Sequence, residues 1–178
     1  MNIIDSVFFH EDNYCQIELL PIQNLFSENS AMQNYSNENF NGDGFITATA
    51  RDETKFPLYK LEISYSSFVL IVEKIALFSI EKVYTGYLSH RVLKNNISAY
   101  GFENYILYIE SNNGLISKLW IDYYLFSDTL NGYPHTLQTT LYELGLKYEL
   151  VLVDWNEFLT VILKNNNQLN EYISQVLD

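Results

Sequence analysis

The chain has 178 residues, 48% of them hydrophobic and 18% charged, and 22 acidic residues against 10 basic ones give a net charge of −12. This length and apolar content predict a single globular domain, residues 1–178, with a sizeable core. The acidic balance argues against nucleic-acid binding, which needs a basic surface, and suits a basic protein partner or merely a solvated surface.

Cysteine content and hydropathy indicate the compartment. The single cysteine, Cys15, excludes an internal disulfide framework, indicates a reducing compartment, and stands in an apolar run that favours a buried, inert thiol. The first residues lack a basic segment, and Asp5 interrupts their apolar run, so no secretory signal is predicted. The longest apolar run, residues 68–80, contains Glu73 and Lys74 and is too short for a membrane span. We expect a soluble cytoplasmic protein with no membrane partner.

The N-terminal third is predicted to open with a β-hairpin. Residues 3–9 and 14–20 are apolar-rich runs, and the intervening His10-Glu11-Asp12-Asn13 favours a turn through local side-chain hydrogen bonds. Pro21 fits the first turn of a helix that fades near Asn34. The predicted continuation is an Asn/Gly-rich loop at 37–44, a strand at 45–50, a polar loop at 51–57 and a short strand at 58–63.

The next segment predicts a helix, a strand and a long loop. Ser66 is the predicted N-cap of a helix that reaches Leu77, although its β-branched residues leave a strand as an alternative. Residues 80–85 predict a strand that Gly86 closes. Residues 87–103 show no clear period and predict a loop of a length that is often functional or mobile. The buried stripe of the helix is predicted at Phe68, Ile71, Val72 and Ile75, with Glu73 and Lys74 on the open side.

Residues 104–124, NYILYIESNNGLISKLWIDYY, carry the clearest structural pattern. Asn113-Gly114 is a strong hairpin signal because both residues tolerate positive φ, and the flanking runs alternate with a period of two. Neither set of alternating residues is fully polar, so both faces of this hairpin are expected to be covered. We predict that it forms the centre of the sheet.

The C-terminal part predicts alternating helices and strands. After a connector at 126–132, Pro134 opens a helix to about Lys147, with Leu137, Leu141 and Leu144 on one face. Residues 150–153 read as a buried strand, residues 158–163 as another, and a last amphipathic helix runs through Leu169, Tyr172, Ile173 and Val176. The predicted fold class is α+β: a single domain with a mostly antiparallel sheet, a central hairpin and flanking helices.

No catalytic or metal-binding motif is present. His10-Glu11-Asp12 is better explained as a turn with solvated charges, because adjacent side chains rarely converge on one ion. His90 and His135 fit no zinc spacing, and residues 41–44 lack the later Glu of a calcium loop. The glycine-rich and nucleophile motifs of nucleotide-binding proteins and hydrolases are also missing. We expect no metal, no cofactor and no catalytic residue.

Tyrosine is abundant, with 15 Tyr beside 11 Phe, and its amphipathic ring is favoured at protein interfaces. Tyr84, Tyr87, Tyr100 and Tyr105 cluster in or beside the predicted long loop, with acidic residues nearby. A core or scattered-surface position remains an alternative for each of them. The predicted contacts for a basic partner are Tyr84, Tyr87, Glu103, Glu110 and Asp122.

Three segments carry a family resemblance. DSVFFHEDNYCQIELLP at 5–21, VYTGY at 83–87 and LYELGLKYELVLVDWNE at 141–157 resemble blocks of immunity proteins from bacterial contact-dependent growth inhibition systems. The resemblance implies a cytoplasmic protein, not an enzyme, that binds and neutralises a cognate toxin, commonly a nuclease. In one similar group the toxin inserts a β-hairpin that extends the sheet of the immunity protein. No individual binding residue is carried over, because contact surfaces vary most within such families.

Three hypotheses follow. The first is an immunity protein, or antitoxin, whose acidic surface binds a basic nuclease toxin. The second is a small-molecule hydrolase with a dispersed site that uses His10 or His90 with nearby carboxylates, which a cleft joining such groups would support. The third is a homo-oligomeric scaffold domain, which a large two-fold-related apolar patch would support.

Overall fold

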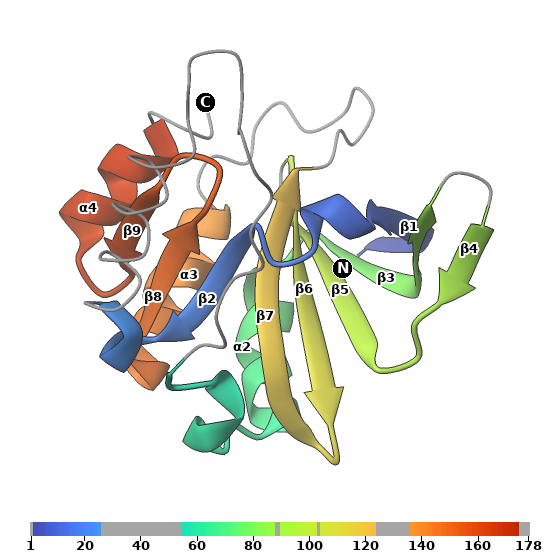
Figure 1. The fold of residues 1–178 in the computed structure, drawn as a ribbon, viewed down its shortest axis with the longest axis horizontal. Coiled ribbons are helices and arrows are strands. Elements are labelled where there is room, and N and C mark those ends of the chain that lie inside the picture. The colour runs from blue at the N-terminus through green and yellow to red at the C-terminus, as the bar shows by residue number, and fades with distance from the viewer. Residues whose placement is uncertain (1, 26–54, 88–89, 103, 124–135, 175–178) are drawn as a thin grey trace.

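The β6–β7 hairpin lies at the centre of the sheet, as the sequence predicts (Figure 1). The computed structural model describes residues 2–25, 55–87, 90–102, 104–123 and 136–174. Strands β6 (Tyr105–Asn112) and β7 (Leu115–Tyr123) pair antiparallel, and their turn has φ of 51° at Asn113 and 77° at Gly114. A two-residue hairpin turn of this kind needs positive φ at both residues, and Asn and Gly adopt such values more readily than other residues.

The described strands form one nine-stranded sheet in the order β1-β3-β5-β6-β7-β2-β8-β9, with β4 paired to β3. All pairings are antiparallel except that of β1 with β3. This confirms the prediction of an α+β domain with a mostly antiparallel sheet. The other strands are β1 (Asn2–His10), β2 (Ile17–Pro21), β3 (Phe78–Tyr87), β4 (His90–Leu93), β5 (Ile97–Phe102), β8 (Leu150–Asp154) and β9 (Leu159–Ile162).

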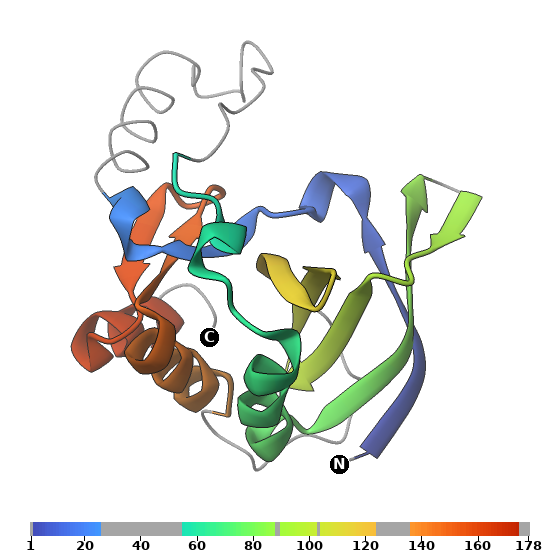
Figure 2. The ribbon, with the colours of Figure 1, turned by 90° about the horizontal axis from the view of Figure 1, so that it is seen from below.

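Both faces of the central hairpin are buried, as predicted. On one face, Leu107 and Ile109 belong to the larger core, which lies under helices α2 (Tyr65–Ile75) and α3 (Thr136–Tyr148). On the other face, Tyr108 and Trp120 belong to a second core that includes residues of β1. Viewed from below, the segment linking β1 to β2 and the two helices lie on opposite sides of the hairpin (Figure 2).

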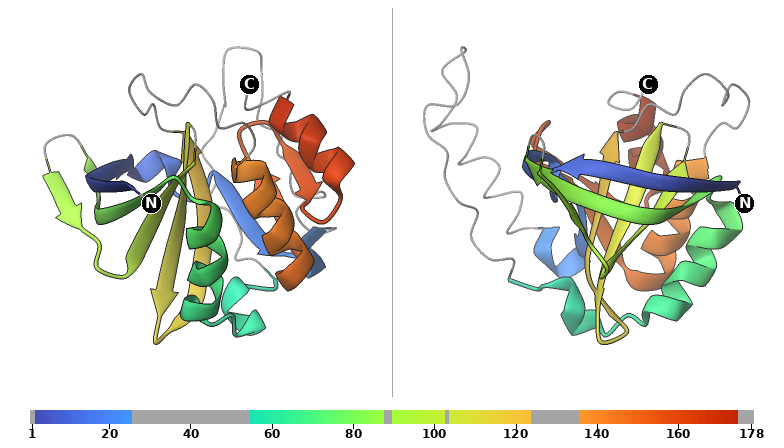
Figure 3. Two further views of the ribbon diagram at one scale, coloured as in Figure 1. Left: turned by 180° about the vertical axis from the view of Figure 1, so that it is seen from behind. Right: turned by 90° about the vertical axis from the view of Figure 1, so that its right-hand side faces the viewer.

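The helices follow the predicted apolar stripes. Helix α2 begins at Tyr65, one residue before Ser66, and buries Phe68, Val69, Ile71 and Val72 while Glu73 and Lys74 stay exposed. Helix α3 buries Leu137, Leu141 and Leu144, and the short α4 (Asn166–Tyr172) buries Leu169 and Tyr172. Seen from behind, α2 and α3 lie in front of the sheet (Figure 3). Within the described residues, no helix has the length and apolar character needed to cross a membrane.

The predicted opening hairpin is wrong. Strand β1 lies at one end of the sheet beside β3, whereas β2 lies between β7 and β8. The turn itself is present as the 3₁₀ segment η1 (Glu11–Asn13), but the chain does not fold back there. Val7 and Phe9 of β1 are instead buried in the second core, which long-range packing builds and local turn chemistry cannot reveal.

The predicted loop at 87–103 is also wrong, since it contains β4 and β5. Five of the six residues of β5 are buried, so the strand lacks the polar face that would have given a visible period. Residues 58–63, predicted as a strand, form the 3₁₀ segment η3 (Leu58–Leu61), which ends at Glu62 with φ of 50°.

Pro21 introduces the 3₁₀ segment η2 (Ile22–Asn24). The rest of the helix predicted there, the loop at 37–44 and the strand at 45–50 fall outside the described residues, as does the connector at 126–132. Strands β8 and β9 are both present, as predicted; β8 is buried along its whole length, and β9 pairs with it antiparallel.

Gly145 of α3 tests how closely this helix packs against the end of β9. A Cβ there would lie 2.4 Å from the Leu163 Cβ and 2.7 Å from the backbone nitrogen of Lys164. Helix propensity favours Ala over Gly by about 1 kcal/mol, but overpacking against backbone costs about 1–3 kcal/mol. We therefore expect Gly145→Ala to lower the free energy of unfolding in urea. The exposed Glu143→Ala on the same helix is the control, and a stabilised Gly145→Ala would contradict this packing.

Candidate functional site

Residues 10–16, here called the strap, cross the face of the β6–β7 hairpin opposite the helices and are fixed at two adjacent residues. The Asn13 side-chain amide donates to both carboxylate oxygens of Asp122, at 3.3 and 3.2 Å. The Tyr14 hydroxyl donates to Glu110 Oε2 at 2.7 Å. Glu110 lies on β6 and Asp122 on β7, so the strap is bonded to both strands of the hairpin.

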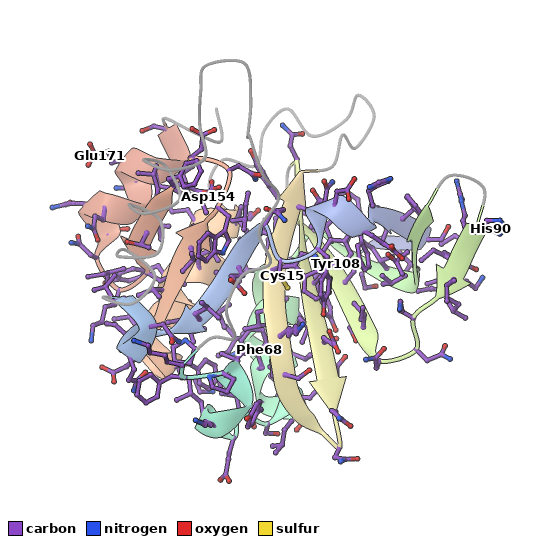
Figure 4. The ribbon with its side chains drawn as sticks, viewed as in Figure 1. Cys15, Phe68, His90, Tyr108, Asp154 and Glu171 are labelled. Atoms are coloured by element: carbon purple, nitrogen blue, oxygen red, sulfur yellow. The ribbon has the colours of Figure 1, made fainter. Side chains whose placement is uncertain are left out.

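An aromatic cluster fills the space beneath the strap. The rings of Tyr108 and Trp120 stack with centroids 5.0 Å apart, and Phe9 meets both edge-on at 5.2 and 5.4 Å. Tyr14 covers Trp120 at 4.9 Å, and the ammonium of Lys118 lies 4.6 Å from the centre of the Tyr14 ring. Figure 4 labels Cys15 and Tyr108 where the strap crosses the hairpin.

An open cavity of about 880 Å³, here called the acidic cavity, lies where the strap meets β7 and the end of β8. Glu11, Asp12 and Asp122 contribute three carboxylates to its wall, and its lining contains neither Lys nor Arg. Three carboxylates with no cation among them attract positively charged groups. The cavity is therefore suited to receive basic side chains. Its remaining lining residues are Asn13, Gln16, Ile17, Ile121 and Asn156.

The structure brings together two of the five predicted contact residues. Glu110 and Asp122 lie on one face of the hairpin and bind neighbouring strap residues. Tyr84 lies on β3 between the buried Val83 and Thr85, so its half-buried side chain points to the opposite face. Tyr87 ends β3 but its side chain is not described, and Glu103 is outside the described residues.

Sequence reasoning missed the contribution of the strap to this site. Glu11 and Asp12 were predicted to be solvated turn residues, and the structure places them beside Asp122 in one cavity wall. The bonds that fix the strap join residues far apart in the sequence: Asn13 and Asp122 are 109 positions apart, and Tyr14 and Glu110 are 96 positions apart. The sequence shows that Glu11 and Asp12 are adjacent, but it does not show that they lie close to Asp122 on β7.

Of the two histidines of the hydrolase hypothesis, His10 is half-buried and His90 is exposed. His10 Nδ1 lies 3.1 Å from an Asp12 carboxylate oxygen, but these side chains are 36% and 82% exposed, so the pair is not held in a desolvated cleft. His90 is exposed on β4. Over the described part of the chain, no group of three or more His, Cys, Asp and Glu residues is arranged to hold a metal ion.

The bond between Tyr14 and Glu110 has a consequence at high pH. Burial, followed by the hydrogen bond to Glu110, raises the pKa of Tyr14 above its ordinary value. Above pH of about 10 the phenol ionises in the unfolded chain while folded Tyr14 keeps its proton. The unfolded state then binds fewer protons, so the free energy of unfolding falls as the pH rises.

We expect Tyr14→Phe to lower the free energy of unfolding near neutral pH by about 1 kcal/mol, the usual contribution of one hydrogen bond. The variant should also lose less stability than the wild type between pH 8 and pH 11, because one phenol with a raised pKa is removed. Urea unfolding at both pH values measures this difference, with Tyr59→Phe as the exposed control. Equal alkaline losses in wild type and Tyr14→Phe would show that Tyr14 does not contribute.

The comparisons with known proteins return no match: no family model, no curated protein and no solved structure is similar to this chain.

Proposed function

We propose that this protein is a cytoplasmic immunity protein that binds a cognate toxin, a basic nuclease, and blocks it without catalysing any reaction. The observation that carries the proposal is the acidic cavity, in which Glu11, Asp12 and Asp122 come from two distant segments and meet without a basic residue in the lining. A group of acidic residues is the complement of a surface that binds phosphate.

The charge of the whole chain supports the same partner. A nuclease must hold phosphate groups and so tends to be basic, and a net charge of −12 would attract such a protein over long range. Complementary potentials raise the association rate and disfavour wrong partners. The bound immunity protein would occupy the surface that nucleic acid needs.

The preorganised strap also supports binding of a partner protein. The first resembling segment, residues 5–21, spans the second half of β1, the whole strap and β2. The strap is fixed by side-chain hydrogen bonds to Glu110 and Asp122, which hold Glu11 and Asp12 at the cavity before any partner arrives. Such preorganisation reduces the entropy cost of binding.

The sheet offers a second kind of contact. Strands β1 and β9 end the order of the described strands, and all four residues of β4 are exposed. A hairpin added to such an edge gains main-chain hydrogen bonds, as the resemblance implies. The acidic cavity would then supply the charge recognition and the sheet edge the main-chain contacts.

The double variant Glu11→Lys/Asp12→Lys tests the cavity against the toxin encoded beside this gene. Charge reversal at the cavity should lower the association rate by about tenfold or more and weaken its dependence on salt. Stopped-flow or surface-based kinetics at low and high salt measure both quantities. Rescue of cells that express the toxin should weaken in parallel.

The control is Glu81→Lys/Glu143→Lys, which changes the net charge equally at exposed residues outside the cavity lining. If both double variants lose association rate equally, the cavity is not the contact. If the wild-type chain neither binds the toxin nor rescues cells, the immunity function itself is wrong.

A further inference from the structure

The sheet forks at β3. This strand pairs with β5 only through Phe78–Ile80, whereas its far end, Tyr84–Tyr87, pairs with β4. Figure 1 shows β4 and the end of β3 diverging from β5 as an arm, in which β1 stays paired with β3. A cavity of about 400 Å³, here called the fork cavity, lies between this arm and β5–β6, and Tyr14 and Glu11 of the strap form part of its wall.

Opposite charges face the fork cavity without neutralising each other. Lys94 follows β4 and is held by its backbone N–H, which donates to the Val83 carbonyl at 2.8 Å. Glu110 lines the same cavity from β6, and no ion pair within 4.0 Å joins the two side chains. The lining therefore carries both signs of charge, with Lys94 beside two acidic residues, Glu11 and Glu110.

The carboxylate of Glu110 is fixed in position. Tyr14 donates to one oxygen at 2.7 Å, and the Asn96 side-chain amide donates to the other at 3.3 Å. Each carboxylate oxygen has two lone pairs, so both can accept a further hydrogen bond. Glu110 is thus preorganised to receive a cationic donor.

A buried hydroxyl in the cavity wall has no partner. Thr85 is 4% exposed, and its Oγ1 has no hydrogen-bond partner among the described residues. Buried polar groups are nearly always paired, so this hydroxyl is an exception. Thr85 lines the fork cavity, but its Oγ1 is buried below the cavity surface and does not itself contact a ligand placed there.

The rest of the lining is apolar on one side, where Phe9 and Ile97 are 3% and 9% exposed. We propose that the fork cavity binds a free α-amino acid with an apolar side chain. Its ammonium would bind Glu110, its carboxylate would bind Lys94, and its side chain would contact Phe9 and Ile97. A simple amine would leave Lys94 without an anionic partner, and a simple carboxylate would leave Glu110 without a cationic one. The cavity volume is in the usual range of ligand sites. This site does not depend on toxin binding.

Titration of the purified chain with L-leucine and L-phenylalanine, followed by calorimetry and amide NMR, tests the proposal. We expect saturable binding of at least one of them with Kd below about 1 mM. The matched probes are 3-methylbutylamine and 4-methylpentanoate, which are leucine without its carboxylate or without its ammonium. Each should bind about tenfold or more weakly than leucine, because one charged wall is left unpaired.

The variants Lys94→Met and Glu110→Gln should each weaken amino-acid binding about tenfold, as expected for loss of a charge-assisted hydrogen bond. Lys147→Met and Glu143→Gln are exposed controls on α3 that should bind like the wild type. If Glu110→Gln unfolds, Lys94→Met still carries the test.

No saturable binding of either amino acid at about 10 mM would overturn the proposal, since that is ten times the expected upper limit for Kd. Binding that is unchanged in Lys94→Met, or leucine and its two one-charge analogues binding equally, would also overturn it. Shifts of amide signals confined to residues outside the fork cavity would place the ligand elsewhere and reject this site.

Discussion

The burial of both faces of the β6–β7 hairpin is the constraint on which the rest of the structure depends. Helices α2 and α3 cover one face. The other face carries Tyr108 and Trp120, whose large apolar side chains must also be shielded from water. Covering them takes Phe9 of β1 and Tyr14 of the strap, which pack on Trp120. The N-terminal segment therefore crosses the sheet, and its acidic turn, Glu11–Asn13, lies near the end of β7. The candidate site is a consequence of how the second core is closed.

The same constraint explains which elements could be predicted from the sequence. Asn113-Gly114 and the alternating strands beside it are local signals, so the central hairpin was predictable from its own residues. The opening hairpin was not predictable, because its two runs pair with strands far away in the sequence and the strap between them packs on Trp120. Strand β5 was missed for a related reason, since burial on both faces removes the alternation by which a strand is recognised.

The candidate site was predictable only as a set of charges. Acidic residues in the hairpin pointed to Glu110 and Asp122, and the structure places both against the strap. Tyr84 was grouped with them by closeness in the sequence, but strand alternation turns it to the other face. Lys94, Asn96 and Thr85 line one cavity with Glu110 because β3 pairs with β5 at one end and with β4 at the other. Such a fork leaves no signal in the sequence pattern of a single strand.

The strap links the two cavities physically. Glu11 lines both of them, while its neighbours Asn13 and Tyr14 fix the strap to Asp122 at one cavity and to Glu110 at the other. The strap is also held by the Trp155 N–H, which donates to the Gln16 carbonyl at 2.9 Å, and by the packing of Tyr14 on Trp120. A group bound to Glu110 in the fork cavity shares the acceptor that holds Tyr14, so it contacts the same seven-residue strap that presents Glu11 and Asp12 to a partner protein. Any coupling between the cavities is then reciprocal, because a partner that fixes the strap changes the affinity of the fork cavity by the same factor.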